Sequence, residues 1–253
     1  MNRWGGWVLG AAVFVWGAGA HAGGSAVSAP TSPAARSAAS AKTAGKAFSS
    51  QALPADLKRF LDQVQSRYEG LQDFRAHFTQ ETRVQTAPVA EKASGEVFFR
   101  KPGQMRWNYE KPEPQEIVIS RGKLWQYVPG DHQVVVQGFD AARVEYTFLT
   151  GVGKIARDFK PRWSRPKTRP GDRLTYIDLL PRDEQASFSK VTLGVRSSDH
   201  RILATEVTDL FGNVTVIRFE NLRDNLKLSN ETFVFKVPKG VDVIDTTEGH
   251  PAS

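Results

Sequence analysis

The residues that could carry out catalysis are few in this chain of 253 residues, and they form no recognisable motif. A serine nucleophile in a Gly-x-Ser-x-Gly turn is absent, and so is a His-Glu-x-x-His metal site. The histidines of the expected mature chain are scattered without ligand spacing at positions 77, 132, 200 and 250. The sequence therefore predicts no enzyme, no metal site and no cofactor.

Three weaker features point the same way. Gly151 to Ile155 looks only faintly like a phosphate-binding loop, because no hydroxyl residue follows Lys154 and no glycine stands five positions before it. His77 could be a base in an apolar pocket, although a satisfied or exposed histidine is the simpler interpretation. The Asp183-Glu184 pair beside Pro181 is typical of a solvated turn.

A run of alternating residues between Arg100 and Val136 carries more information. Met105, Trp107 and Tyr109 alternate with polar residues, so a period of two places three large side chains on one face of a strand. Such a face can simply fill a core, but the polar tips of its aromatic residues favour the mouth of a cavity that holds an apolar molecule. The predicted cavity residues are Val97, Phe99, Met105, Trp107, Tyr109, Ile117, Ile119 and Trp125.

The elements that position this face are mostly short strands. An amphipathic helix is expected from Leu53 to Gly70, with Pro54 in its first turn and Gly70 at its end. A strand begins near Phe74, and turn residues separate the runs that follow. These runs are Gly95–Arg100, Met105–Glu110, Glu116–Ser120, Lys123–Val128, Gln133–Gln137, Leu174–Leu180, Ser189–Val195, Ile202–Asp209, Val214–Leu222 and Thr232–Val237. The predicted fold is mainly β, an antiparallel meander of short strands that curves into a barrel or a half-barrel.

A second helical segment is expected within Glu145–Phe159, because apolar residues recur there every three or four positions. Gly151 and Gly153 weaken it, so it could be a mobile flap or a permanently packed plug.

The N-terminus predicts export. Residues 1–22 read as a cleaved signal peptide, with Arg3 before an apolar run from Val8 to Ala20 and a small-residue cleavage site. Residues 23–50 are rich in Ala, Ser and Pro and are expected to form a disordered tether before one domain over 51–248. The chain has no cysteine, so we expect neither disulfides nor a lipid anchor of its own.

The net charge of +7 is concentrated in one place. Residues 157–173 hold seven basic residues against two acidic ones. This segment is predicted to be a solvated loop, or alternatively a docking patch for an acidic partner or anionic lipid headgroups. A polyanion-binding protein would spread its charge more widely, so nucleic acid is not an expected partner.

An ordered set of residues resembles a known family, that of the periplasmic outer-membrane lipoprotein carrier LolA. The matching positions are Phe74, Phe78, Gln80, Gly95, Lys101-Pro102, Arg106-Trp107, Tyr109, Pro112, Gln115, Ile117, Gly122, Leu124-Trp125, Tyr127, Gln133-Val134, Phe233, Phe235 and Val237-Pro238 with Gly240 to Val243. The resemblance implies an unclosed antiparallel β-barrel, or half-barrel, covered by a helical lid, with an apolar cavity between them. The lid would come from the helical segments over 53–70 and 147–159, and its residues would be Leu57, Phe60, Leu61, Val64, Phe148, Leu149 and Ile155. The resemblance also implies a monomeric periplasmic chaperone that shields the acyl chains of lipoproteins in that cavity. It further implies that an ABC-type complex of the inner membrane releases the cargo to it, and that it delivers the cargo to an acceptor at the outer membrane.

The resemblance also gives Lys101 a role. The family commonly holds its lid shut with an arginine that precedes the strand-end proline and bonds lid carbonyls, and Lys101 occupies that position. Arg100 is expected to point to the opposite face of the strand. One alternative function is a periplasmic sensor of the same fold that grips a lipid or a regulatory membrane protein. A second is the acceptor itself, which would need a lipidated N-terminal cysteine.

Overall fold

The computed structural model describes residues 53–139, 155–183 and 186–247, and these form one continuous sheet with short helices. The strands are β1 (Asp73–Arg83), β2 (Glu91–Arg100), β3 (Gln104–Lys111), β4 (Gln115–Ser120), β5 (Lys123–Val128), β6 (Gln133–Gly138), β7 (Phe159–Trp163), β8 (Leu174–Pro181), β9 (Phe188–Arg196), β10 (Arg201–Asp209), β11 (Val214–Asp224) and β12 (Asp242–Asp245). The helices are α1 (Ala55–Gly70) and α3 (Ile155–Asp158), with 3₁₀ turns η2 (Pro129–Asp131) and η3 (Asn230–Phe233).

The sheet has twelve strands in the order β12-β6-β5-β4-β3-β2-β1-β11-β10-β9-β8-β7. Neighbouring strands pair antiparallel, except that β12 pairs parallel with β6. The edge strands β12 and β7 are not paired with each other. The described residues therefore confirm the predicted unclosed half-barrel.

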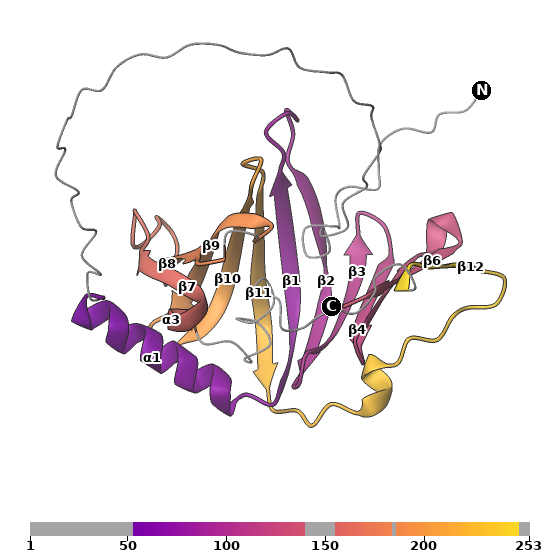
Figure 1. Cartoon of the computed structure of the whole chain (residues 1–253), viewed down its shortest axis with the longest axis horizontal. Helices are drawn as coiled ribbons and strands as arrows, with labels where there is room; N and C mark the ends of the chain where they lie inside the picture. The colour runs from indigo at the N-terminus through magenta and orange to yellow at the C-terminus, as the bar shows by residue number, and fades with distance from the viewer. Residues whose placement is uncertain (1–52, 140–154, 184–185, 248–253) are drawn as a thin grey trace, which may run out of the picture.

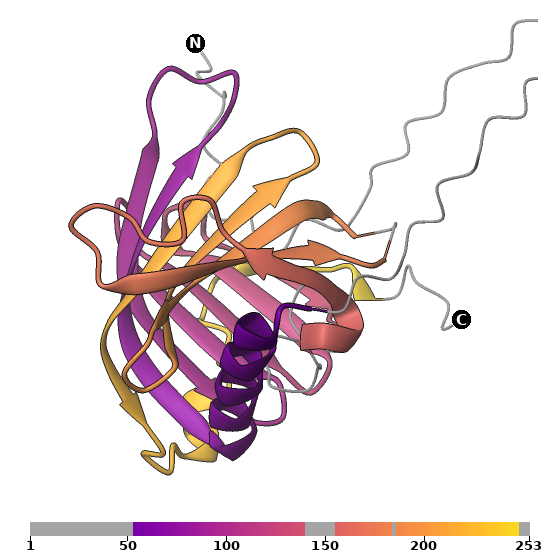
Figure 2. The same cartoon turned by 90° about the vertical axis from the view of Figure 1, so that its left-hand side faces the viewer.

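The sheet curves, and α1 lies across its concave side with α3 beside it (Figures 1 and 2). The helix forms because Leu57, Leu61 and Val64 repeat at helical spacing, and all three are buried against the sheet. It begins after Pro54, whose carbonyl accepts the first helical hydrogen bond from Lys58 N–H at 2.9 Å, and ends where Leu71 turns extended.

The predicted strand over Thr232–Val237 is wrong. The chain leaves β11, forms η3 against β3 and β4, and reaches β12 at the edge of the sheet without pairing over 232–237. The alternation of Phe233 and Phe235 has another cause, because both rings pack on the convex face. Phe233 lies under the Arg100 guanidinium at 4.8 Å, and Phe235 lies 6.2 Å from Tyr127. We call residues 225–241 the strap.

The basic segment also differs from its prediction. Residues 159–163 form strand β7, because Phe159 and Pro161 alternate as buried residues and pair with Pro181 and Leu179 of β8. A proline is tolerated there because β7 is an edge strand. In the predicted helix over 145–159, residues 155–158 are helical, and residues 140–154 lie outside the described residues.

Gly95 allows β2 and β3 to approach closely at a bulge between Ser94 and Gly95. A Cβ placed on Gly95 would lie 1.9 Å from the Asn108 carbonyl oxygen. We expect Gly95→Ala to lower the free energy of unfolding by about 1–3 kcal/mol, as overpacking typically does, in urea denaturation. Gly138→Ala is the control, because no atom lies within 4 Å of a Cβ there. Equal midpoints for the two variants would contradict the steric argument.

Candidate functional site: the concave face and its covering helix

The strand register gathers most of the predicted cavity residues on one face. Val97, Trp107 and Ile117 form one row across β2, β3 and β4, and Phe99, Met105 and Ile119 form the next. Tyr109 lies on the same face, one step further along β3. All seven are buried, with exposures of 8% or less, in the same apolar cluster as the buried residues of α1.

The prediction that Trp125 belongs to this face is wrong. Trp125 pairs with Val118, which pairs with Arg106, and Arg106 lies on the opposite face from Met105 and Trp107. A two-residue turn at Arg121-Gly122, both with positive φ, joins β4 to β5 and fixes this register. Leu124, which is 2% exposed, therefore takes the concave position.

The prediction also missed about half of the concave face. Other apolar residues of the face come from β1 and from the strands after it in sheet order: Phe74, Ala76, Phe78, Ile177, Leu179, Val191, Leu193, Val195, Ile202, Ile217 and Phe219. The alternation of Phe74, Ala76 and Phe78 with polar residues is a sequence signal that could have placed the residues of β1 on this face, and their burial alternates in the same way. At the centre, the Phe78 ring lies 4.9 Å from both Trp107 and Tyr109.

The predicted lid residues of α1 lie against this face. Leu57, Leu61 and Val64 are buried, and the Phe60 ring lies 5.4 Å from Trp163 of β7. Ile155 of α3 is also buried, and its N–H donates to Gln65 Oε1 at 3.3 Å. Phe148 and Leu149 lie outside the described residues. Because the side chains of α1 pack directly into the cluster, the structure describes this face in its covered state.

Lys101 lies at the end of α1, as the latch prediction requires. Its Nζ donates to the carbonyl oxygens of Tyr68 at 2.5 Å and Glu69 at 2.9 Å. These carbonyls belong to the last turn of α1, where no further helical N–H can reach them. Partial burial lowers the pKa of Lys101 below its ordinary value. Arg100 points to the convex face, as predicted, where it donates to Leu228 O at 2.8 Å in the strap.

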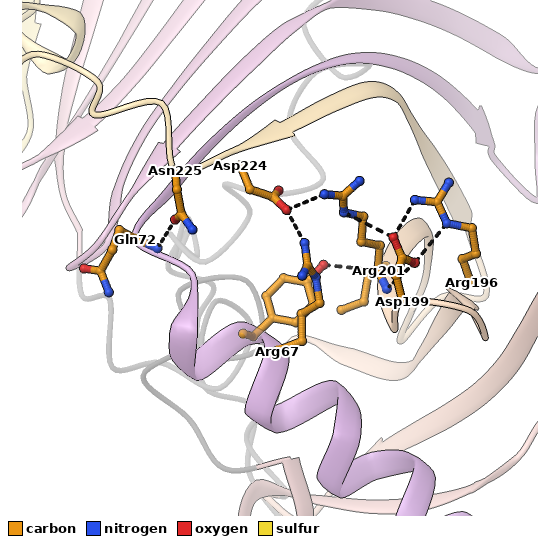
Figure 3. A network of polar contacts seen from close by, with 9 residues as sticks. Arg67, Gln72, Arg196, Asp199, Arg201, Asp224 and Asn225 are labelled. Atoms are coloured by element: carbon orange, nitrogen blue, oxygen red, sulfur yellow. Dashed lines mark hydrogen bonds and ion pairs between the residues drawn. The ribbon is translucent and has the colours of Figure 1, made fainter.

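Other polar contacts fasten the same end of α1 and were not predicted (Figure 3). Asp224 of β11 accepts hydrogen bonds from Arg67 and, at 2.7 Å, from Arg201, which also pairs with Asp199. The Tyr68 hydroxyl accepts from Ile202 N–H at 3.1 Å. Burial of that hydroxyl raises the pKa of Tyr68 to about 12, although part of the residue remains exposed.

A separate contact holds the N-terminal end of α1. Trp163 Nε1 donates to Asp56 Oδ2 at 2.9 Å, and Lys167 Nζ lies 3.5 Å from the centre of the Trp163 ring. The hydrogen bond between Trp163 and Asp56 joins residues 107 positions apart, so no local pattern could have revealed it. Both ends of α1 are thus tied by polar groups, while its middle is held by apolar packing.

Sites for other chemistry find little support in the described residues. His77 is on the convex face, 52% exposed, with its Nε2 3.4 Å from Glu96, so it is not a base in an apolar pocket. Within the described ranges, His, Asp and Glu side chains nowhere gather in threes that could hold a metal ion. None of the described helices has the length and apolar character needed to span a membrane.

Comparison with known proteins identifies the family to which this chain belongs. The family model described as "Outer membrane lipoprotein carrier protein LolA" matches residues 69–236. The chain belongs to the LolA family. An outer-membrane lipoprotein carrier protein from Alkalilimnicola ehrlichii is 31% identical over 77% of this chain and 85% of its own length. One from Methylococcus capsulatus is 31% identical over 75% of this chain and 86% of its own.

Solved structures show a distant likeness. A LolA superfamily protein from Nitrosomonas europaea aligns with a TM-score of 0.40 and 13% identity, over 70% of this chain and 97% of that one. The family match covers α1 only from residue 69 onward, so the helix that covers the concave face stands mostly before the matched segment.

The Lys101 contact generates a prediction. Lys101→Met removes the ammonium group that donates to the last turn of α1. We expect amide hydrogen exchange in α1 to accelerate by about tenfold, which corresponds to the free energy of one net hydrogen bond. Lys101→Arg keeps a donor and is the control. Unchanged exchange in Lys101→Met, while the rest of the protein is also unchanged, would show that Lys101 does not hold the helix.

Proposed function

We propose that this protein is a periplasmic chaperone that carries acylated lipoproteins, with their acyl chains sheltered on the concave face beneath α1. The observation that carries the proposal is the combination of a continuous apolar face with a covering helix, α1, that polar contacts fasten mainly at its ends. The relatives are named as lipoprotein carriers, which supports the same cargo here.

The energies involved favour displacement of the helix by cargo. Burial of each of the three apolar side chains of α1 contributes about 1.5–3 kcal/mol. An acyl chain of about 16 carbons would contribute roughly 12 kcal/mol at about 0.8 kcal/mol per CH₂. A single chain can therefore replace the contacts of Leu57, Leu61 and Val64 with the sheet, provided that the polar contacts at one end of α1 release.

In this proposal the cavity is the space that α1 vacates, and Val97, Phe99, Met105, Trp107, Tyr109, Ile117 and Ile119 line it. Lys101 acts as the latch. The cargo arrives from an ABC-type release complex of the inner membrane and leaves to an acceptor at the outer membrane. The signal peptide over 1–22, the tether over 23–50, the domain limits of 51–248, the monomeric state and the lack of enzymatic activity remain predictions.

A pair of photo-crosslinking variants tests the cargo site. A photoreactive phenylalanine analogue at position 107 is expected to crosslink an added triacylated lipopeptide, because Trp107 lies on the concave face. The same analogue at position 125 is the matched control, because it also replaces a tryptophan but on the convex face. Crosslinked products are counted by mass spectrometry. Equal yields at both positions, or no yield at 107, would contradict the proposed site.

A further inference from the structure

One threonine on the concave face has no hydrogen-bond partner. Thr205 of β10 is 1% exposed, and its Oγ1 is buried without a partner. Its neighbours across the sheet are Ile217 of β11 and Leu193 of β9, so the hydroxyl lies in an apolar row. The other buried atom without a hydrogen bond in the described chain, Arg201 Nε, lies 3.4 Å from the Asp199 carboxylate.

The other polar side chains buried on this face are satisfied. Tyr109 donates to Gln80 Oε1 at 3.1 Å, Gln80 Nε2 donates to Thr82 Oγ1 at 3.4 Å, and Thr82 and Thr215 share a hydrogen bond of 3.2 Å. Burial raises the pKa of Tyr109, so its hydroxyl stays protonated and able to donate. Thr205 is therefore an exception within a face that otherwise pairs its polar groups.

An unpaired hydroxyl in this position costs stability. It has lost its hydrogen bonds to water and gained none, whereas valine fills nearly the same volume without that loss. A β-branched residue is needed in this strand, but valine meets that need equally well. The hydroxyl is therefore best explained by a group that reaches it when the concave face is occupied.

We propose that Thr205 Oγ1 donates a hydrogen bond to an acyl carbonyl, that of the ester group that links an acyl chain to the glycerol of the lipoprotein. The inference rests on the proposed function and refines its ligand. Acyl chains offer only dispersion contacts, but the carbonyl at the head of each chain is a strong acceptor. That carbonyl loses water when the chain enters an apolar site. A donor already desolvated at Thr205 compensates for this loss, so the face distinguishes acyl linkages from plain hydrocarbon.

The test compares two lipopeptides with identical chains, one with ester links to glycerol and one with ether links, which lack the carbonyl. We expect the wild-type protein to bind the diester about three- to tenfold more tightly, the worth of one hydrogen bond. Thr205→Val should remove that preference, and Thr205→Ser, which keeps a hydroxyl, should retain it. Affinities are measured by isothermal titration calorimetry.

Thr192→Val is the matched control. Thr192 of β9 is as buried as Thr205, but it lies on the convex face and donates to Asp178 Oδ1 at 2.9 Å. The Thr192→Val variant should keep the preference for the diester. The denaturation midpoints should move in opposite directions, up for Thr205→Val and down for Thr192→Val.

Two results would overturn the inference: a diester preference that survives in Thr205→Val, or a midpoint that falls in that variant, which would mean that the hydroxyl is already paired in the empty protein. A wild-type protein that binds neither lipopeptide would instead contradict the proposed function.

Discussion

The structure depends on one constraint: a large apolar sheet face must be covered in water, and under the proposed function that cover must also be able to leave. A closed barrel would bury that face permanently, and an uncovered one would aggregate. Here twelve strands curve without closing, and one helix of 16 residues lies over the concave face. The cover must therefore be stable enough to keep water out and weak enough to yield to cargo.

The division of contacts along α1 meets both demands. Its apolar middle supplies most of the contacts with the sheet, and a hydrocarbon chain can make similar apolar contacts in its place. Its ends are held by Lys101, Asp224 and Trp163 through directional contacts, which a hydrocarbon chain cannot replace. Polar contacts at the partly exposed ends of a helix contribute less than their number suggests, because water competes for the same groups. Water can thus take over these contacts when the helix lifts, and the cost of opening stays modest.

Much of the fold could be predicted from local patterns, because alternation and turn residues report on short-range geometry. The strands from Gly95 to Gln137 and the helix near Leu57 were predicted for this reason. Trp125 was placed on the wrong face because one two-residue turn decides the register of β5, and a shift of one position reverses every side chain. The segment Thr232–Val237 was predicted to be a strand because its two phenylalanines are two positions apart. In the structure both rings pack on the convex face of the sheet, and the segment does not pair with a sheet edge. The contact between Asp56 and Trp163 depends on the completed fold, so the sequence held no signal for it.

The end of β2 shows why the cover and the sheet behave as separate parts. Arg100 and Lys101 are consecutive, so their side chains leave the chain on opposite sides. Arg100 binds the strap on the convex face, and Lys101 binds α1 on the concave face. The buried carboxylate of Asp73 adds to the first contact by accepting from Leu226 N–H at 2.6 Å, so the convex side is fastened to a buried group. On the concave side, Lys101 pairs with the carbonyls of a helix end, and Arg67, Tyr68 and Asp224, which fasten the same end, are only partly buried. Under load the concave contact should break first, and α1 should move while the strapped sheet keeps its curvature.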